Sequence, residues 1–89
     1  MHIIAKHTVT DPEGFIAATP SVAQNAPPGV HPLLFCPAED RTSAVCLWQS
    51  ESLDSVRDYL DAVSAHLCDT TYFVVDATVA IGLPAAQAV

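Results

Sequence analysis

Hydrophobic and polar residues alternate along this chain with two different spacings, which together predict six secondary-structure elements. Runs rich in β-branched residues predict strands over 2–9, 30–37, 42–49 and 71–76. Apolar residues at helical spacing predict one helix beginning at Pro12 and a second over 53–67. The order βαββαβ is that of an α+β, ferredoxin-like sandwich, with a four-stranded antiparallel sheet and two helices on one face.

Local signals refine the first helix. Asp11 is a favourable N-cap because its carboxylate can accept a hydrogen bond from a free backbone N–H, and Pro12 fits the first helical position. Pro20 interrupts the apolar stripe of this helix. Because proline cannot donate the backbone hydrogen bond, we expect a kink or two short helical pieces near Thr19.

The remaining elements carry similar signals. Pro32 and Pro37 predict that the second strand is irregular or lies at a sheet edge. The serines and glutamate of 50–52 offer an N-cap for the second helix, and the polar residues within 68–70 are expected to end it. Arg57 and Asp61 are spaced to form an exposed i,i+4 ion pair.

Both faces of the predicted sheet are apolar. The strand over 42–49 places Ala44, Cys46 and Trp48 on one face, but Val45 and Leu47 on the other. Two helices cover one face, and a chain of 9.4 kDa cannot cover the second. Burying ~500 Å² per subunit would contribute about 12 kcal/mol before entropy losses. We therefore expect a homodimer whose sheets stack face to face, with one domain over 1–84 and a tail over 85–89.

Composition narrows the function classes. Three basic residues against ten acidic ones give a formal charge of −7, which argues against nucleic acid and anionic membranes as partners. The hydrophobic fraction of 51% argues against disorder, and no apolar run predicts a membrane span or a secretion signal. The three cysteines, an odd count in apolar surroundings, indicate small buried residues in a reducing cytoplasm. The sequence has no glycine-rich loop for a nucleotide.

Two pairs of residues could form a site. His7 and His31 could bind a transition metal such as Ni or Zn if their strands lie close or meet across a dimer, although the interpretation that needs no ligand is that each is a locally hydrogen-bonded residue. Trp48 and Tyr72 share a strand face and could line a pocket for a small planar ligand together with these histidines, or could simply be core aromatics. His2 and His66 are expected at the surface.

Six segments of the chain resemble small bacterial members of the dimeric α/β-barrel superfamily, some of them described as nickel-responsive. The likeness covers 7–15, 28–30, 44–48, 52–60, 72–76 and 80–84. It implies a ferredoxin-like fold that forms a barrel by dimerisation. The superfamily also includes cofactor-free monooxygenases, isomerases and haem-degrading enzymes. The haem-degrading members use an Asn together with a Trp and a His, and the only asparagine here is Asn25, in a predicted turn.

Two functions follow as hypotheses, beside the possibility of an accessory or stabilising subunit with an empty interior. The first is a small homodimeric protein that binds a metal ion or a small apolar ligand. The second is a cofactor-independent monooxygenase or isomerase-like enzyme acting on a small aromatic or polyketide-like compound, with His7 or His31 as the base. A metal analysis of the purified protein tests whether the ligand of the first hypothesis is a metal ion. An open pocket beside Trp48 would favour the enzyme.

Overall fold

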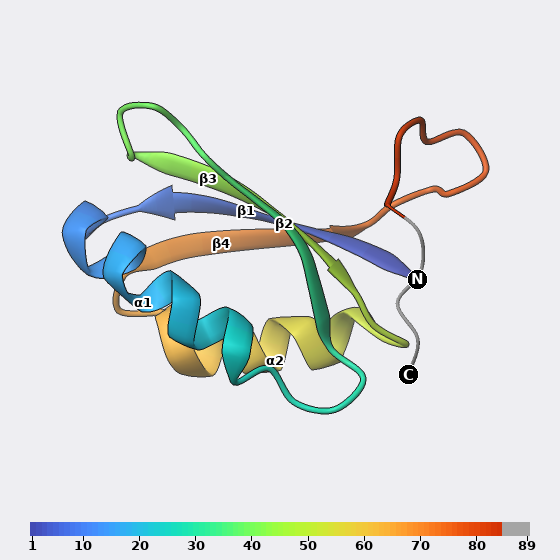
Figure 1. Ribbon diagram of the computed structural model, residues 1–89, viewed down its shortest axis with the longest axis horizontal. Helices are drawn as coiled ribbons and strands as arrows, with labels where there is room; N and C mark the ends of the chain where they lie inside the picture. Colours follow the sequence, from blue (N-terminus) through green and yellow to red (C-terminus); the bar gives the residue numbers. More distant parts are fainter. Residues whose placement is uncertain (85–89) are drawn as a thin grey trace.

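Four strands and two helices follow one another in the predicted order in the computed structural model, which describes residues 1–84 (Figure 1). The elements are β1 (His2–Val9), α1 (Pro12–Gln24), β2 (His31–Pro37), β3 (Ser43–Gln49), α2 (Leu53–Ser64) and β4 (Cys68–Val74). The predicted tail over 85–89 lies outside the described residues.

The strands form one antiparallel sheet in the order β2-β3-β1-β4. Both helices pack on the same face of this sheet, so the structure has two layers (Figure 1). The predicted ferredoxin-like α+β sandwich is therefore confirmed. Among the described residues, no helix is long and apolar enough to cross a membrane.

The first helix begins as predicted but continues past Pro20. Asp11 is the N-cap, and its Oδ1 accepts a hydrogen bond of 3.1 Å from the Gly14 backbone N–H. The prediction of two helical pieces near Thr19 is wrong, because a single helix runs over Pro12–Gln24 with Pro20 inside it. Pro20 removes one backbone N–H donor from this helix. One turn earlier, the Thr19 hydroxyl donates to the Phe15 carbonyl at 2.9 Å. At the end of the helix, the backbone N–H of Asn25 donates to the Ser21 carbonyl.

The last strand begins earlier than the sequence pattern predicts. Residues 68–70 were expected to break the second helix, but α2 already ends at Ser64 and β4 begins at Cys68. The reason is pairing with β1, which places Cys68 opposite Val9 and Thr70 opposite His7. The backbone N–H groups of 10 and 11 also donate to the Leu67 carbonyl, which holds the turn before β4 against the start of α1.

The second strand has the predicted irregularity and position. It is an edge strand, and its register with β3 shifts between Pro32 and Leu34. Pro32 lies opposite Trp48, whereas Leu34 lies opposite Leu47, so one extra residue is accommodated on β2. This bulge is at the strand where the two prolines restrict pairing.

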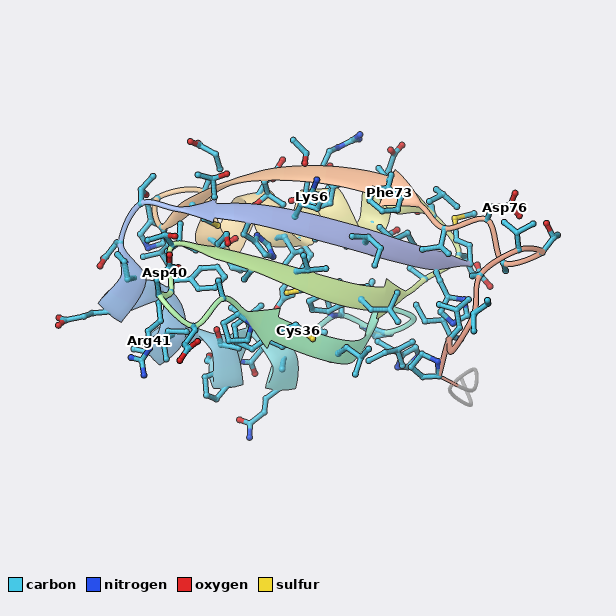
Figure 2. All side chains as sticks on the ribbon, turned by 90° about the horizontal axis from the view of Figure 1, so that it is seen from above. Lys6, Cys36, Asp40, Arg41, Phe73 and Asp76 are labelled. Atoms are coloured by element: carbon cyan, nitrogen blue, oxygen red, sulfur yellow. The ribbon has the colours of Figure 1, made fainter. Side chains whose placement is uncertain are left out.

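The two faces of the sheet differ in how well the chain covers them. On the helix face, Ile3, Ala5 and Val56 of α2 are fully buried in the main core. On the other face, which we call the open face, the side chains of Leu34 and Phe73 remain 51% and 48% exposed. Figure 2 looks onto the open face and shows Phe73 on β4 beside Lys6 on β1. The predicted apolar character of both faces is thus present, with one face left uncovered by the described residues.

Candidate functional site

A cavity of about 270 Å³ lies between the sheet, α1 and the edge strand β2. Phe15, Ala18 and Val22 contribute its α1 wall, and Leu33 and Phe35 contribute its β2 wall. The rings of Phe15 and Phe35 approach to a centroid distance of 5.9 Å at one side of the cavity. Most of the lining is therefore apolar, as expected for a site that holds a small organic molecule.

His7 is a polar group on the sheet side of this cavity and is 4% exposed. Its position follows from the register, since β1 is a central strand and His7 lies between Ala44 of β3 and Thr70 of β4. The ring atom Nδ1 is 2.8 Å from the Thr70 hydroxyl, and Nε2 is 3.2 Å from the Cys46 sulfur. Both ring nitrogens thus have partners, which fixes the imidazole in the sheet.

Burial sets the protonation states of this group. It lowers the pKa of His7 below its usual 6.5, so the imidazole is neutral at physiological pH. Burial also raises the pKa of the Cys46 thiol to about 12, so this sulfur carries its proton. When the Cys46 thiol donates to Nε2, Nδ1 carries the ring proton and donates to Thr70. The arrangement is suited to a neutral base or hydrogen-bonding group, and it disfavours a thiolate nucleophile.

A second thiol completes the surroundings of His7. The Cys68 sulfur lies 3.6 Å from Nδ1 of His7 and 3.5 Å from the Thr70 hydroxyl, and it donates to the Ser64 carbonyl. Phe15 packs against the imidazole ring with a centroid distance of 5.3 Å. Hydroxyl, thiol and aromatic groups therefore surround His7. Such groups form hydrogen bonds with a neutral imidazole ring or pack against it.

Trp48 is the second polar group of the cavity. It is 3% exposed, and its indole N–H has no hydrogen-bond partner within the described chain. The Trp48 N–H lies near the Cys46 sulfur without meeting hydrogen-bond geometry, and it acts to lower the pKa of that thiol against the larger effect of burial. The Tyr59 ring meets Trp48 edge-on at a centroid distance of 6.3 Å. An unpaired buried donor is uncommon, and a bound molecule with an acceptor would satisfy it.

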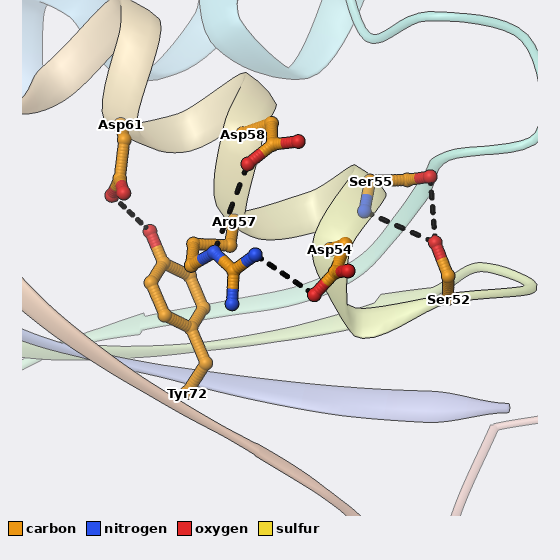
Figure 3. A network of polar contacts seen from close by, with 7 residues as sticks. All are labelled: Ser52, Asp54, Ser55, Arg57, Asp58, Asp61 and Tyr72. Carbon is orange, nitrogen blue, oxygen red and sulfur yellow. Dashed lines mark hydrogen bonds and ion pairs between the residues drawn. The ribbon is translucent and has the colours of Figure 1, made fainter.

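Tyr72 does not line this cavity. Its side chain lies on the helix face of β4, at the opposite edge of the sheet from β2, and its hydroxyl donates to Asp61 of α2 at 2.8 Å (Figure 3). Burial, followed by the adjacent Asp61 carboxylate, raises the pKa of the Tyr72 hydroxyl. The predicted ion pair between Arg57 and Asp61 is wrong: Arg57 contacts Asp54 at 2.8 Å and Asp58 at 3.7 Å, because Asp61 is engaged by Tyr72.

His31 does not meet His7 within one chain. The register places His31 beside Gln49 on the open face, whereas His7 points to the helices from the other face. Within residues 1–84, no group of three or more His, Cys, Asp or Glu side chains could hold a metal ion. Of the four predicted pocket residues, His7 and Trp48 thus line the cavity, and His31 and Tyr72 lie elsewhere.

The sequence pattern did not identify several partners of His7. The prediction that the three cysteines are small buried residues is confirmed for Cys46 and Cys68, which also contact the imidazole, and is wrong for Cys36, which is exposed on the edge strand β2. Thr70 was expected to end a helix. Alternation places Cys46 and Trp48 on one face, and this signal could have linked Cys46 to the cavity once β1 and β3 were known to be neighbours.

Comparison with known proteins found no matching family model, no matching curated protein and no matching solved structure. The functional proposal therefore rests on the cavity and on the open face of the sheet.

Proposed function

We propose that this protein is a homodimer that binds a small, planar, largely apolar molecule in the cavity beside His7. The observation that supports the proposal is an apolar cavity of about 270 Å³ lined by the neutral imidazole of His7 and by Trp48, whose buried indole N–H has no partner within the described chain. Such a combination of apolar walls and few polar groups is typical of ligand pockets.

The cavity volume indicates the size class of the ligand. An engineered cavity of about 150 Å³ in another protein accommodates benzene. A cavity of about 270 Å³ therefore has room for a two-ring molecule. The unpaired N–H of Trp48 favours a ligand that carries a carbonyl or phenolic oxygen. We favour an organic ligand over a metal in this cavity, because the described part of the chain supplies no group of three metal-ligating side chains.

The open face supports the dimer. Leu34, Leu47, Ile4 and Phe73 form one continuous row across all four strands, according to the pairing of β2, β3, β1 and β4. Strand spacing and rise give this four-stranded face a projected area of ~450 Å². Leu34 and Phe73 at the two edges of the row are about half exposed, whereas Leu47 is 4% exposed, so the uncovered apolar surface is smaller than this area. A patch of this size is within the range of the largest apolar patch on a monomer, and such patches are often interaction sites.

A second copy is the partner that fits this face. A stable interface buries about 800 Å² per subunit, so the sheet alone is too small. The segment after β4 extends beyond the sheet on the side away from the helices (Figure 1), and it carries Val79 and Ile81, which are 74% and 98% exposed. These side chains can extend the contact onto a partner.

A reducing compartment such as the cytoplasm fits the free thiols of Cys46 and Cys68 beside His7.

The cavity proposal can be tested by fluorescence, because Trp48 is the only tryptophan. We expect 1-naphthol or 1,4-naphthoquinone to quench Trp48 emission with saturation. Ala18→Leu fills the cavity from α1 and should weaken this binding at least tenfold. Ala17→Leu adds the same atoms on the exposed side of α1 and is the matched control.

The two variants also define the negative result. Quenching that stays linear with probe concentration, or equal binding by Ala18→Leu and Ala17→Leu, would show that the probe does not enter the cavity. Circular dichroism of both variants checks that α1 is intact, so that loss of binding is not confused with loss of folding.

A second candidate function is a cofactor-independent monooxygenase or isomerase-like enzyme acting on a small aromatic or polyketide-like compound. The low pKa of His7 favours it, because an unprotonated imidazole can accept a proton from a bound phenol or activated C–H group once the substrate replaces the Cys46 thiol as the partner of Nε2. A cyclic 1,3-diketone in D₂O is a suitable probe. Exchange at its acidic carbon should be faster with the protein than with buffer, and His7→Gln should abolish the difference. Equal exchange rates with wild type and His7→Gln would exclude His7 as the base.

A further inference from the structure

The strand β4 forms one border of the sheet (Figure 2), and it exposes apolar side chains on both of its faces. Phe73 points to the open face and is 48% exposed. Val74 points to the helix face, where its neighbour on β1 is the fully buried Ile3, yet Val74 is 46% exposed. A copy stacked on the open face would cover Phe73 but not Val74. A strand placed alongside β4 would cover both.

The hydrogen bonds of β4 show which of its backbone groups are free. The Val75 N–H donates to the carbonyl of His2 at 2.8 Å, and His2 itself is half-buried although it was expected at the surface. Alternate residues of an antiparallel strand face the same neighbour, so the odd-numbered residues of β4 bond to β1. The N–H and C=O groups of Thr70, Tyr72 and Val74 therefore point away from the sheet.

The two edges of the sheet differ in how they are protected. β2 carries Pro32, Pro37 and a bulge, which are features that prevent another strand from pairing with an edge. β4 contains no proline and pairs with β1 without a register shift. Its residues 70–74 are uncharged and are mostly β-branched or aromatic, which favours strand pairing. Only the β4 edge is thus open to a further strand.

We propose that the free edge of β4 pairs in antiparallel orientation with β4 of a second copy, which gives a continuous eight-stranded sheet. A second copy fits because it presents the same uncharged strand with the same spacing of free backbone groups, and a two-fold axis makes such an edge complementary to itself. The interface lies at the border of the sheet and not on the open face. It therefore goes beyond the proposed function and can form with or without face-to-face stacking.

A two-fold axis beside Phe73 gives the register that best covers the exposed side chains. Tyr72 of one copy and Val74 of the other then exchange backbone hydrogen bonds, and the two Phe73 rings adjoin as a close cross-strand pair. On the helix face, Val74 packs beside the partner's Tyr72. Asp76 lies opposite Thr70 in this register, so two carboxylates do not meet across the strands.

Charges on α2 set the conditions for pairing. This helix lies beside β4, since Asp61 accepts the hydrogen bond of Tyr72, so edge pairing brings the two α2 helices near each other. Their outer residues are mainly acidic, and Arg57 is already engaged by Asp54 and Asp58. The copies should therefore pair more strongly when salt screens this repulsion. Because one strand edge is smaller than a standard interface, pairing is expected at high protein concentration.

Backbone hydrogen exchange, followed by NMR on the full chain at low and high protein concentration, tests the edge in the wild type. We expect the amides of Tyr72 and Val74 to become protected as the concentration rises. Phe35 is the internal control. The Ala38 N–H donates to the Ser43 carbonyl of the neighbouring chain segment, so alternation points the Phe35 N–H away from β3 at the other edge. The Phe35 amide should exchange rapidly at both concentrations.

A proline at position 74 tests the backbone contact. Proline is tolerated in a strand where the N–H faces outward, so Val74→Pro should keep the bonds of β4 to β1. It removes one donor from each copy and hence two hydrogen bonds from the interface, which should weaken association at least about tenfold in sedimentation. Val74→Thr keeps the N–H and the branched shape and is the matched control.

Leu34→Asp separates the edge from the open face. Leu34 lies on β2, at the opposite border of the sheet, so this variant should lose face-to-face stacking and keep the concentration-dependent protection of Val74. Three results would overturn the proposal: exchange at Tyr72 and Val74 that is independent of concentration, equal association of Val74→Pro and Val74→Thr, and loss of the protection in Leu34→Asp. Failure of the edge leaves face-to-face stacking to be judged by sedimentation alone.

Discussion

At the scale of single residues, the burial of His7 makes stability depend on pH. Burial lowers the pKa of His7 below 6.5 in the folded state, so the unfolded chain binds this proton more readily. The stability contributed by neutral His7 is therefore complete above about pH 6.5 and decreases as the pH falls toward the folded-state pKa. We expect the urea midpoint to decrease between about pH 7 and pH 5.

Two measurements isolate this effect. The lowered pKa values of Asp40 and Asp76 act below 3.8, outside this range. The wild type should therefore lose more stability than His7→Gln over the same pH interval. An NMR titration of the wild type needs no variant, and a His7 midpoint above 6.5 would contradict the expectation.

The cysteines should differ sharply in reactivity. Cys36 is exposed on β2, whereas Cys46 is buried and its thiol pKa is raised to about 12. The thiolate is the reactive form, so in the dissociated chain Cys46 should remain unmodified by a maleimide at pH 8 while Cys36, which lies on the open face, reacts. Mass spectrometry after limited labelling locates the modified peptide. Cys36→Ser should remove the fast reaction, and fast labelling of Cys46 in the folded protein would contradict the burial of the His7 cluster.

At the scale of elements, the start of α1 is fixed by a close approach at Gly14. A Cβ at this position would collide with the Asp11 carboxylate that caps the helix and would lie 2.9 Å from a Leu67 methyl group. Gly14→Ala should therefore destabilise the protein by ~1–2 kcal/mol through loss of the cap and overpacking. The free energy of unfolding in urea measures this cost.

A double-mutant cycle tests the cause of that destabilisation. Asp11→Ala removes the carboxylate, at a cost of about 1 kcal/mol for the lost cap. With the carboxylate absent, adding Gly14→Ala should cost less than it does in the wild type, because only the Leu67 contact remains. Strict additivity of the two substitutions would show that the collision with Asp11 is not the cause.

The sequence pattern predicted elements better than their ends. Strand alternation and the helical stripe located all six elements, because each buries one face. The end of α2 was missed because Leu67 continues the helical spacing of Val63. In the structure, Leu67 packs in the cluster around Phe15 from a turn, not from a helix. Tertiary packing buries Leu67 outside the helix, so the helical spacing of this residue could not locate the end of α2.

The candidate site was predictable only in part, because strand order decides which side chains meet. His7, Trp48 and Tyr72 share the helix face, which follows from the pairing of β1 with β3 and β4 and not from alternation within any one strand. The cavity, however, opens beside β2, and Tyr72 lies on β4 at the other edge. Alternation within one strand carries no information about its neighbours. The bulge also shifts the register of β2 against β3. The prolines of β2 indicated that this strand is irregular, but they did not indicate where the register shifts.

At the scale of the whole molecule, the proposed dimer would have to form despite a formal charge of −7 on each chain. Among the strand residues of the open face, the charged side chains are Lys6 and Asp69, and acidic residues such as Asp54 and Asp58 lie on the outer surface of α2. Attraction across the proposed interface would therefore be apolar, while repulsion between the two net charges would act over a longer range. Salt screens the repulsion between the charges without weakening the apolar attraction.

Sedimentation of the tag-free chain at two salt concentrations tests this balance. The screening length falls from ~30 Å at 0.01 M salt to about 8 Å at 0.15 M, so the dimer should dissociate less at the higher concentration. Phe73→Asp, on the open face, should yield monomers under both conditions, whereas Ala62→Asp, which adds the same charge on exposed α2, should behave nearly as wild type. A stable 9.4 kDa species for the wild type would exclude the dimer, and tighter association at low salt would show that ion pairs hold the interface.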